Sequence, residues 1–316
     1  MYWFGRFLER AKPSLDNIIF NNFLLFHLRS AKPDYVLAEF GTTAAWLIHA
    51  CKAANVPLYV IFHGYDASVY SLLEENKYSY QQIFKYASGI IAVSKVMQRK
   101  LISLGASPSK IKWSPCGVDP EIFKGGEPEK ASPTFFCVGR FVEKKAPYLT
   151  ILAFHKAQQS YPEAKLRLIG DGPLLGPCKR LVQALNLENS VTFLGPLGPN
   201  EVASEMRSAR AFVQHSVVAE NGDSEGTPVA VIEAQMTSIP VISTKHAGIP
   251  DVVIDGQTGY LVDEGDIDGM AASMIKLLTN PSHAKELGDA GRERSKSLFT
   301  LDHHINAIAE IIHQKK

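Results

Sequence analysis

Short apolar runs of strand length alternate with segments of helical periodicity through the first part of the chain. Such runs, bounded by glycine, proline and polar residues, are typical of a parallel sheet whose strands are joined by crossover helices. The pattern predicts strands at 35–40, 58–64, 89–94 and 111–117, with helices near 16–30, 43–54, 78–87 and 96–104.

A polar stretch, KGGEPEKASP at 124–133, interrupts this rhythm, and its glycine, proline and charge are typical of a linker. Beyond it the pattern restarts. It predicts strands at 134–139, 166–172, 191–195, 211–216, 240–244 and 259–263, and a helical tail over 266–314. We therefore expect an α/β protein with two Rossmann-like, doubly wound domains that face a cleft. Ligands are expected beyond the carboxyl ends of the strands.

The stretch DSEGTPVAVIEAQMTSIPVIST at 223–244 has the pattern of an acidic turn, a short helix and a buried strand. Thr227 suits the N-cap of this helix, and Pro228 suits its first position, where the missing N–H is harmless. The helix is apolar almost all round, so we expect it to be buried.

Two carboxylates, Glu225 and Glu233, interrupt that apolar pattern. The free N–H groups of a helix N-terminus suit an anion such as phosphate, and carboxylates accept charge-assisted hydrogen bonds from sugar and ribose hydroxyls. A structural interpretation is equally consistent with the two acids alone. In that interpretation Glu225 complements the helix dipole, and Glu233 reaches solvent or a lysine.

Further polar groups follow the ends of predicted strands. Arg140 and Lys145, in GRFVEKKAP, lie on the loop after the strand at 134–139, where both could reach one pyrophosphate. Taken by themselves, the two cations are better explained as a solvated basic turn. His63 and Asp66, in HGYD, follow another strand, but a lone loop histidine is a weak sign of catalysis.

The turn GDGP, with Gly170 and Gly172, follows a strand but does not match the GxGxxG pattern of nicotinamide cofactors. The sequence also lacks a histidine pair at metal-ligand spacing, a nucleophile elbow and a Walker lysine motif. We therefore expect neither a bound metal nor a nicotinamide cofactor.

The composition, with 46% hydrophobic and 21% charged residues, is that of a soluble globular protein, and a formal charge of +1 gives no case for a nucleic-acid partner. The four cysteines lie far apart, which favours buried thiols in a reducing compartment over disulfides or zinc. No stretch is long and apolar enough to span a membrane. The aromatic and basic first twelve residues are expected to cover the sheet, with contact to a membrane surface as the alternative.

Taken in order, GRFVEKKAP, GDGP, VTFLG and SEGTPVAVIEAQ with its E-x7-E spacing resemble a known family. It is that of the retaining GT-B glycosyltransferases, specifically family 4, the group 1 transferases. The segment at 91–123 is similar to the end of that family's first domain, and GDSEGTPVAVIEA followed by HAGIPDVV is especially similar to transferases of exopolysaccharide and colanic-acid-type assembly. The resemblance runs from about residue 33 to the end of the chain.

The resemblance implies roles for the residues already singled out. Arg140 and Lys145 would bind the diphosphate of a nucleotide-sugar donor and stabilise its growing charge as the sugar leaves. Glu233 would accept the ribose hydroxyls, Glu225 those of the transferred sugar, and His63 would approach that sugar from the first domain. The implied donor-binding set also contains backbone and turn residues: Gly226, Thr227, Pro228, Val229, Gly170 and Gly172.

The same resemblance implies an acceptor-side domain at 1–126, a donor-binding domain at 133–296, and a last helix at 297–316 that packs back on the first domain. The implied reaction retains the anomeric configuration, needs no metal, and moves a sugar to a glycan or lipid-linked acceptor. The expected location is cytoplasmic, with a peripheral contact to the inner face of the membrane left open.

The chain departs from the family at its start, where a strand and a glycine-rich loop normally stand. Judged by length, about two βαβ units are missing, so we expect an incomplete first domain. The chain is then either an amino-terminally truncated transferase or a compact variant.

A non-catalytic nucleotide-sugar-binding remnant, regulatory or a partner subunit, is the alternative function, and an epimerase that uses His63 and Asp66 is a weaker one. Smaller departures are Cys116, where asparagine is common, and Asp251, where glutamate is common.

Overall fold

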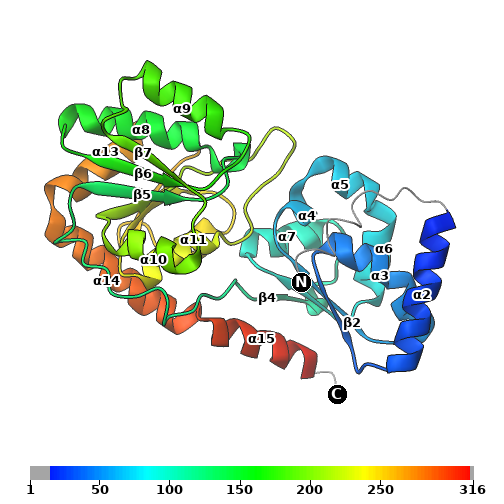
Figure 1. The fold of residues 1–316 in the computed structure, drawn as a ribbon. Coiled ribbons are helices and arrows are strands. Elements are labelled where there is room, and N and C mark those ends of the chain that lie inside the picture. Colours follow the sequence, from blue (N-terminus) through cyan, green and yellow to red (C-terminus); the bar gives the residue numbers. More distant parts are fainter. Residues whose placement is uncertain (1–14, 314–316) are drawn as a thin grey trace.

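The computed structural model describes residues 15–313. The aromatic segment at the start of the chain lies outside this part. Two α/β lobes lie side by side, and a pair of helices runs along one edge of both (Figure 1). Among the described helices, none combines the length and hydrophobicity that crossing a bilayer requires.

The first lobe is built on a parallel sheet with the order β1-β2-β3-β4, in which Val36 of β1 lies opposite Leu58 of β2. Strand β2 is buried along its whole length, which explains why its sequence is a continuous apolar run. The elements of this lobe are α2 (Leu15–Ala31), β1 (Val36–Glu39), α3 (Gly41–Ala54), β2 (Leu58–Phe62), α4 (Tyr65–Ser68), α5 (Tyr70–Glu75), α6 (Lys77–Tyr86), β3 (Gly89–Ala92), α7 (Lys95–Ser103), η1 (Pro108–Lys110) and β4 (Ile111–Trp113).

The second lobe contains a parallel sheet with the order β10-β9-β8-β5-β6-β7. Its elements are β5 (Thr134–Val138), η2 (Glu143–Lys145), α8 (Pro147–Ser160), β6 (Lys165–Ile169), α9 (Leu175–Ala184), β7 (Val191–Gly195), α10 (Pro199–Arg207), β8 (Ala211–Val213), α11 (Val229–Met236), β9 (Val241–Thr244), α12 (Ile249–Val252), β10 (Gly259–Val262), α13 (Ile267–Thr279) and α14 (Pro281–Leu298). The chain winds outward from β5 to β7, then returns and winds the other way from β8 to β10. The direction therefore reverses between β5 and β8, and a doubly wound sheet binds its ligand at such a switch point.

Two apolar layers enclose the second sheet. Helices α8, α9 and α13 contribute to the core on one face, where Phe154 and Met274 are fully buried. Helices α10 and α11 contribute to the core on the other face, together with Met206 and Ile232. The buried side of α11 agrees with the apolar sequence of that helix.

All ten predicted strands are present, and most helices lie where their periodicity places them. The strand predicted at 111–117 is shorter, because only 111–113 pair with β3 before the chain leaves the sheet. Helices α4 and α5 were not predicted, because Val69 separates them in an extended conformation and each is too short to show a period.

The chain passes between the lobes twice, and the two passages are hydrogen-bonded to each other. Val118 forms a parallel bridge with Thr300, donates its N–H to Phe299 O at 2.9 Å and accepts from Leu301 N at 3.0 Å. Val118 and Phe299 are both buried in the second lobe's core. The first passage therefore lies just after β4, ahead of the segment 124–133.

The segment 124–133 is held against the second lobe. The buried guanidinium of Arg210 donates to the carbonyl oxygens of Pro128 and Ala131, each at 2.7 Å, and to Leu277 O at 3.0 Å. Burial lowers the pKa of Arg210. The segment that we predict to be a linker from its composition is therefore fixed to the second lobe by these hydrogen bonds.

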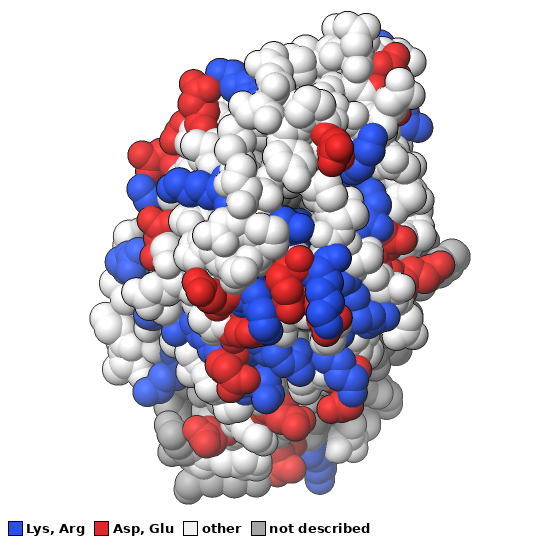
Figure 2. All heavy atoms as spheres, turned by 90° about the vertical axis from the view of Figure 1, so that its left-hand side faces the viewer, with Lys and Arg blue, Asp and Glu red and all other residues white. Residues whose placement is uncertain are grey.

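The last described helix, α15 (Leu301–His313), packs on the first sheet. Ile308 and Ile311 join the core of the first lobe, and the Tyr59 hydroxyl donates to Ile312 O at 3.1 Å. On the face shown in Figure 2, lysine and arginine are interspersed with aspartate and glutamate, so the described residues of that face form no single-sign field.

Candidate active site

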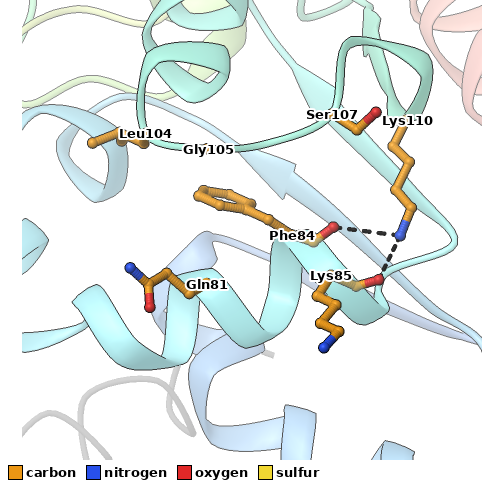
Figure 3. A pocket seen from close by; sticks show the side chains of 7 residues that line it. All are labelled: Gln81, Phe84, Lys85, Leu104, Gly105, Ser107 and Lys110. Carbon is orange, nitrogen blue, oxygen red and sulfur yellow. Dashed lines mark hydrogen bonds between the residues drawn. The ribbon is translucent and has the colours of Figure 1, made fainter.

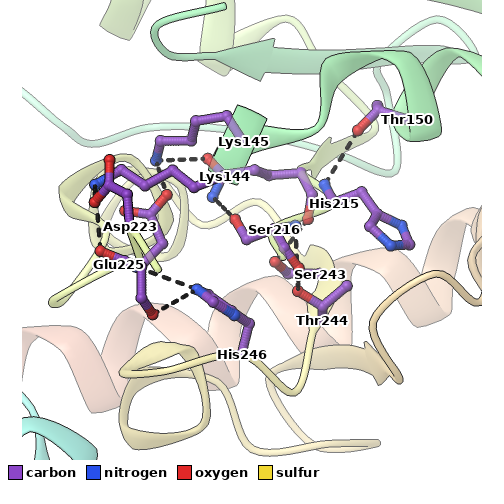
Figure 4. A network of polar contacts seen from close by, with 12 residues as sticks. Lys144, Lys145, Thr150, His215, Ser216, Asp223, Glu225, Ser243, Thr244 and His246 are labelled. Carbon is purple, nitrogen blue, oxygen red and sulfur yellow. Dashed lines mark hydrogen bonds and ion pairs between the residues drawn. The ribbon is translucent and has the colours of Figure 1, made fainter. Parts of the chain in front are cut away.

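Lys145 and Glu225 meet at the switch point of the second sheet. Lys145 follows β5 and Glu225 follows β8, and the Lys145 Nζ atom lies 2.9 Å from Glu225 Oε1. The two side chains are only 16% and 8% exposed. Figure 4 shows Lys144 and Lys145 reaching toward the loop that carries Asp223 and Glu225. The structure therefore brings together two residues that lie far apart in the sequence and that we predicted to share a site.

The Lys145 ammonium forms an ion pair with Glu225 Oε1, and this buried oxygen accepts no hydrogen bond from any other described residue. Burial raises the pKa of Glu225, but the charges of Lys145 and Lys144 outweigh it and hold this pKa below its usual value. Glu225 is thus an ionised, buried acceptor with capacity left for a hydroxyl donor.

The loop that carries Arg140 is fixed by the turn at Gly170 and Gly172. Gly139 N donates to Ile169 O at 3.0 Å, and Phe141 N donates to Asp171 O at 2.9 Å. A Cβ atom at Gly170 would lie 2.0 Å from Gly139 O, and Gly170 has a φ of +127°. Only glycine allows this approach, so the turn GDGP sets the position of the cationic loop.

Arg140 itself is exposed, and no ion pair within residues 15–313 includes it. Lys145 is anchored more firmly, since its ammonium also lies 3.3 Å from Gln214 Oε1. The predicted pair of cations therefore consists of one half-buried, oriented lysine and one exposed arginine on the same loop.

Helix α11 begins at Val229, with Pro228 as its N-cap, so the prediction of Thr227 as N-cap and Pro228 as first helical residue was wrong by one position. The Thr227 hydroxyl caps nothing. It donates instead to the carbonyl oxygen of Val93 in the first lobe. The Thr227 hydroxyl therefore joins the two lobes instead of capping the N-terminus of α11.

Glu233 lies on α11 and is half-buried. Burial raises the pKa of Glu233 to about 7, although the charge of Lys145 acts in the opposite direction. The side chain therefore changes charge close to neutral pH, which is unusual for a carboxyl group.

A second lysine, Lys144, supports the segment 214–228 between β8 and α11, which carries Asp223 and Glu225 and is called the acidic loop below. Its Nζ atom lies 2.8 Å from Asp223 Oδ1 and donates to Ser224 O at 3.2 Å. Neither Lys144 nor Asp223 is assigned to the site from the sequence. The doubled lysine in GRFVEKKAP was the only sequence signal for this contact.

In the first lobe, His63 lies beside Glu39, with its Nε2 atom in contact with Glu39 Oε2. Burial lowers the pKa of His63, but hydrogen bonds to Cys116 and Glu39 outweigh it and raise the pKa to about 10. Phe40 packs on the imidazole, with ring centroids 4.5 Å apart. Glu39 and Cys116 were not assigned from the sequence, because each is a single residue at the end of a different strand.

Asp66 is fully buried, and its two carboxylate oxygens accept from the backbone N–H groups of Gly41, His63 and Gly64 at 2.8–3.0 Å. This carboxylate fixes the loops after β1 and β2. Because backbone donors occupy it, Asp66 is structural, and the acid–base pair that an epimerase would need is not formed.

The lobes approach each other closely beside the site. A Cβ atom at Gly226 would lie 1.8 Å from His63 O, and one at Gly248 would lie 2.8 Å from Ser94 Cβ. Lys95 N donates to Asp251 Oδ2 at 2.8 Å across the same junction. His63 is therefore held close to the backbone of the acidic loop.

A pocket of about 430 Å³ lies elsewhere, in the first lobe between the ends of α6 and α7 (Figure 3). Lys110 Nζ donates to Phe84 O and Lys85 O beside it. The lining loops precede β3 and β4, so this pocket lies at the amino edge of the sheet, away from the Lys145–Glu225 site. Within residues 15–313 no three His, Cys, Asp or Glu side chains are grouped to hold a metal.

The sequence model of the family described as glycosyl transferases group 1 matches residues 118–294, more than half of the chain. The model of glycosyltransferase family 4 matches residues 5–122. The chain belongs to the group 1 glycosyl transferases. The matched region contains the whole Lys145–Glu225 site.

Two relatives in this family are bacterial. AmsK of Erwinia amylovora, an amylovoran biosynthesis glycosyltransferase, is 29% identical over 283 residues, which are 88% of this chain and 70% of AmsK. WcaL of Salmonella typhimurium, whose name assigns it to colanic acid biosynthesis, is 32% identical over 249 residues, or 77% of this chain and 61% of WcaL. The chain thus spans less than three quarters of the length of either relative.

Solved structures show the same architecture. Anabaena HepE in complex with UDP-glucose superposes with a TM-score of 0.81 at 19% identity, over 93% of this chain and 82% of HepE. Sucrose-phosphate synthase of Thermosynechococcus elongatus gives 0.78 at 22% identity, over 96% of this chain and 80% of that enzyme. These similarities and the two parallel sheets confirm the predicted GT-B fold of this group 1 glycosyl transferase.

Proposed function

We propose that this protein transfers a sugar from a nucleotide-diphosphate-sugar to a glycan or lipid-linked acceptor, with retention of anomeric configuration. The proposal rests on the half-buried Lys145–Glu225 pair at the switch point, next to the N-terminus of α11. A cation for phosphate and an ionised acceptor for sugar hydroxyls are what such a donor needs on either side of its anomeric carbon.

In this proposal Lys145 and Arg140 bind the diphosphate, and the N–H groups from Gly226 to Val229 face the sugar and the phosphate. Glu233 accepts the ribose hydroxyls and Glu225 those of the sugar. Gly170 and Gly172 shape the loop beneath the nucleotide. His63, paired with Glu39, approaches the sugar from the first lobe.

The bond between the anomeric carbon and the diphosphate oxygen breaks as the acceptor oxygen bonds to the same face of that carbon. The acceptor proton passes to the departing phosphate. Lys145 stabilises the charge that grows there, so no metal is required for that task. The close approach of the lobes at Gly226 would exclude water and protect the donor from hydrolysis.

The acceptor class rests on the relatives. AmsK is named for amylovoran biosynthesis, and a Mycolicibacterium smegmatis relative, 26% identical over 241 residues, is named as a GDP-mannose-dependent phosphatidylinositol monomannoside mannosyltransferase. A lipid-linked acceptor would place the protein at the cytoplasmic face of a membrane, as a peripheral contact.

A thermal-shift panel with UDP, GDP and ADP, each with and without magnesium, tests donor binding. We expect one diphosphate to raise the melting temperature by a few degrees at about a hundred times its Kd, because it binds only the folded state. Magnesium should change this shift little. If none of the three shifts the melting temperature, the donor site is wrong.

The raised pKa of Glu233 predicts a pH dependence of donor binding. Ribose hydroxyls donate to the ionised carboxylate, so affinity for the stabilising diphosphate should fall as the pH drops below about 7, by up to about tenfold per pH unit. Glu233→Gln should remove this dependence. Calorimetry from pH 5.5 to 8.5 measures the diphosphate affinity of wild type and of Glu233→Gln. The titration of the phosphate affects both proteins equally, so it cancels in the difference between their affinities. Equal slopes in the two proteins would contradict the assignment.

A further inference from the structure

We propose that His246, held by Glu264, is a positioning residue that sets the sugar-binding carboxylate Glu225. This inference rests on the proposed function. His246 lies after β9 and Glu264 after β10, so the carboxyl ends of three neighbouring strands, β8, β9 and β10, contribute to one arrangement. The His246 side chain is only 1% exposed.

The contacts of His246 define its tautomer. Glu225 N lies 3.1 Å from His246 Nε2, and a backbone N–H can only donate, so Nε2 is the acceptor. The other ring nitrogen, Nδ1, lies 2.6 Å from Glu264 Oε1 and therefore carries the proton. Glu264 thus orients the ring and keeps the lone pair of Nε2 directed at the Glu225 backbone.

The same pair fastens both ends of the acidic loop. Glu264 Oε2 accepts from Val218 N at 3.0 Å, near the start of the loop. At its end, the Ser224 hydroxyl lies 3.1 Å from His246 Nε2, beside the Glu225 contact. Figure 4 shows His246 approaching the loop from an element other than the one that carries Lys144 and Lys145.

Different residues therefore position the cation Lys145 and the carboxylate Glu225. Besides its ion pair with Glu225, Lys145 is positioned by its own loop and by Gln214. Glu225 depends on His246 for the orientation of its backbone. Loss of the Nε2 acceptor should therefore displace the group that holds the sugar and leave the group that holds the diphosphate in place.

The test compares His246→Asn with His246→Gln. Asparagine places an amide nitrogen near the Nδ1 position and keeps the Glu264 contact, but offers no acceptor to Glu225 N. Glutamine places its oxygen near the Nε2 position and restores that acceptor. Nucleotide release from UDP-glucose and from GDP-mannose gives kcat and KM, and calorimetry gives the Kd of UDP and GDP.

We expect His246→Asn to lower kcat by about ten- to a hundredfold, since small displacements of a positioning group cost that much. The Kd of the diphosphate should stay within about twofold of wild type, and His246→Gln should recover most of the loss. Wild-type kcat in His246→Asn, equal losses in both variants, or a parallel loss of diphosphate binding would overturn the proposal.

Glu264→Ala provides a second route if the asparagine variant does not fold. The Glu264 side chain is 35% exposed, so this change leaves no buried charge. It should lower kcat in the same direction, again with diphosphate binding retained, and an unchanged kcat would count against the role of His246. A wild-type protein that turns over neither donor would instead refute the proposed function, and the positioning role with it.

Discussion

Replacing Lys145 with alanine is expected to lower the rate of sugar transfer by about a thousandfold, the effect of removing a group that stabilises charge in a transition state. Lys145 is half-buried beside Glu225, so the variant loses a phosphate ligand and leaves an ionised carboxylate with less neutralising charge. Transfer is measured as nucleotide release with wild type in parallel, and diphosphate binding by thermal shift.

Lys156→Ala is the matched control. Lys156 lies in the same lobe, on α8, where it forms an exposed ion pair with Asp268. Exposed pairs of this kind contribute little to stability, so this variant should bind and transfer like wild type. A Lys145→Ala protein that still binds the diphosphate with wild-type affinity would disprove the role of Lys145.

Replacing Gly226 with alanine is expected to lower kcat more than a hundredfold by holding the lobes apart. The new Cβ atom would lie 1.8 Å from His63 O and 2.8 Å from Val93 Cγ2, so the closed arrangement cannot form. Lys145, on the other loop, should still bind the diphosphate within a few fold of wild type. The measurements are kcat, the Kd of the diphosphate, and the radius of gyration by small-angle scattering, which should increase.

Gly176→Ala serves as the control for this second prediction. Gly176 lies in α9 of the same lobe, and a Cβ atom there would contact only Arg180 Nη1, at 3.6 Å. Alanine favours a helix over glycine, so this variant should be as active as wild type and slightly more stable. Wild-type turnover in Gly226→Ala would show that catalysis does not need the closed arrangement.

The strands could be predicted because parallel strands covered on both faces are continuous apolar runs, as LYVIF in β2 is. Their carboxyl ends were less predictable. Residues 114–117, with the sequence SPCG, were included in the strand predicted at 111–117, yet they turn out of the sheet toward the second lobe, where Val118 is buried. Pro115 and Gly117 are residue types that end or interrupt a strand, so this boundary is indicated by residue type and not by hydrophobicity.

The Lys145–Glu225 site could be inferred because each residue lies in a local motif directly after a strand. The contacts of Thr227 and His246 could not be inferred in the same way. The Thr227 hydroxyl bonds to Val93 in the other lobe, and His246 acts on Glu225 through a backbone N–H. A backbone partner does not depend on side-chain identity, so this part of the site is seen only in the three-dimensional structure.

The paired passages at Val118 and Thr300 have a consequence for how substrates enter. Because the two segments are joined by hydrogen bonds, sliding of one lobe along the other would break them, whereas rotation about the pair would not. Opening is then a swing about one axis, in which each contact between lobes widens in proportion to its distance from that axis. The mouth of the site would open first and widest at the rim farthest from this pivot.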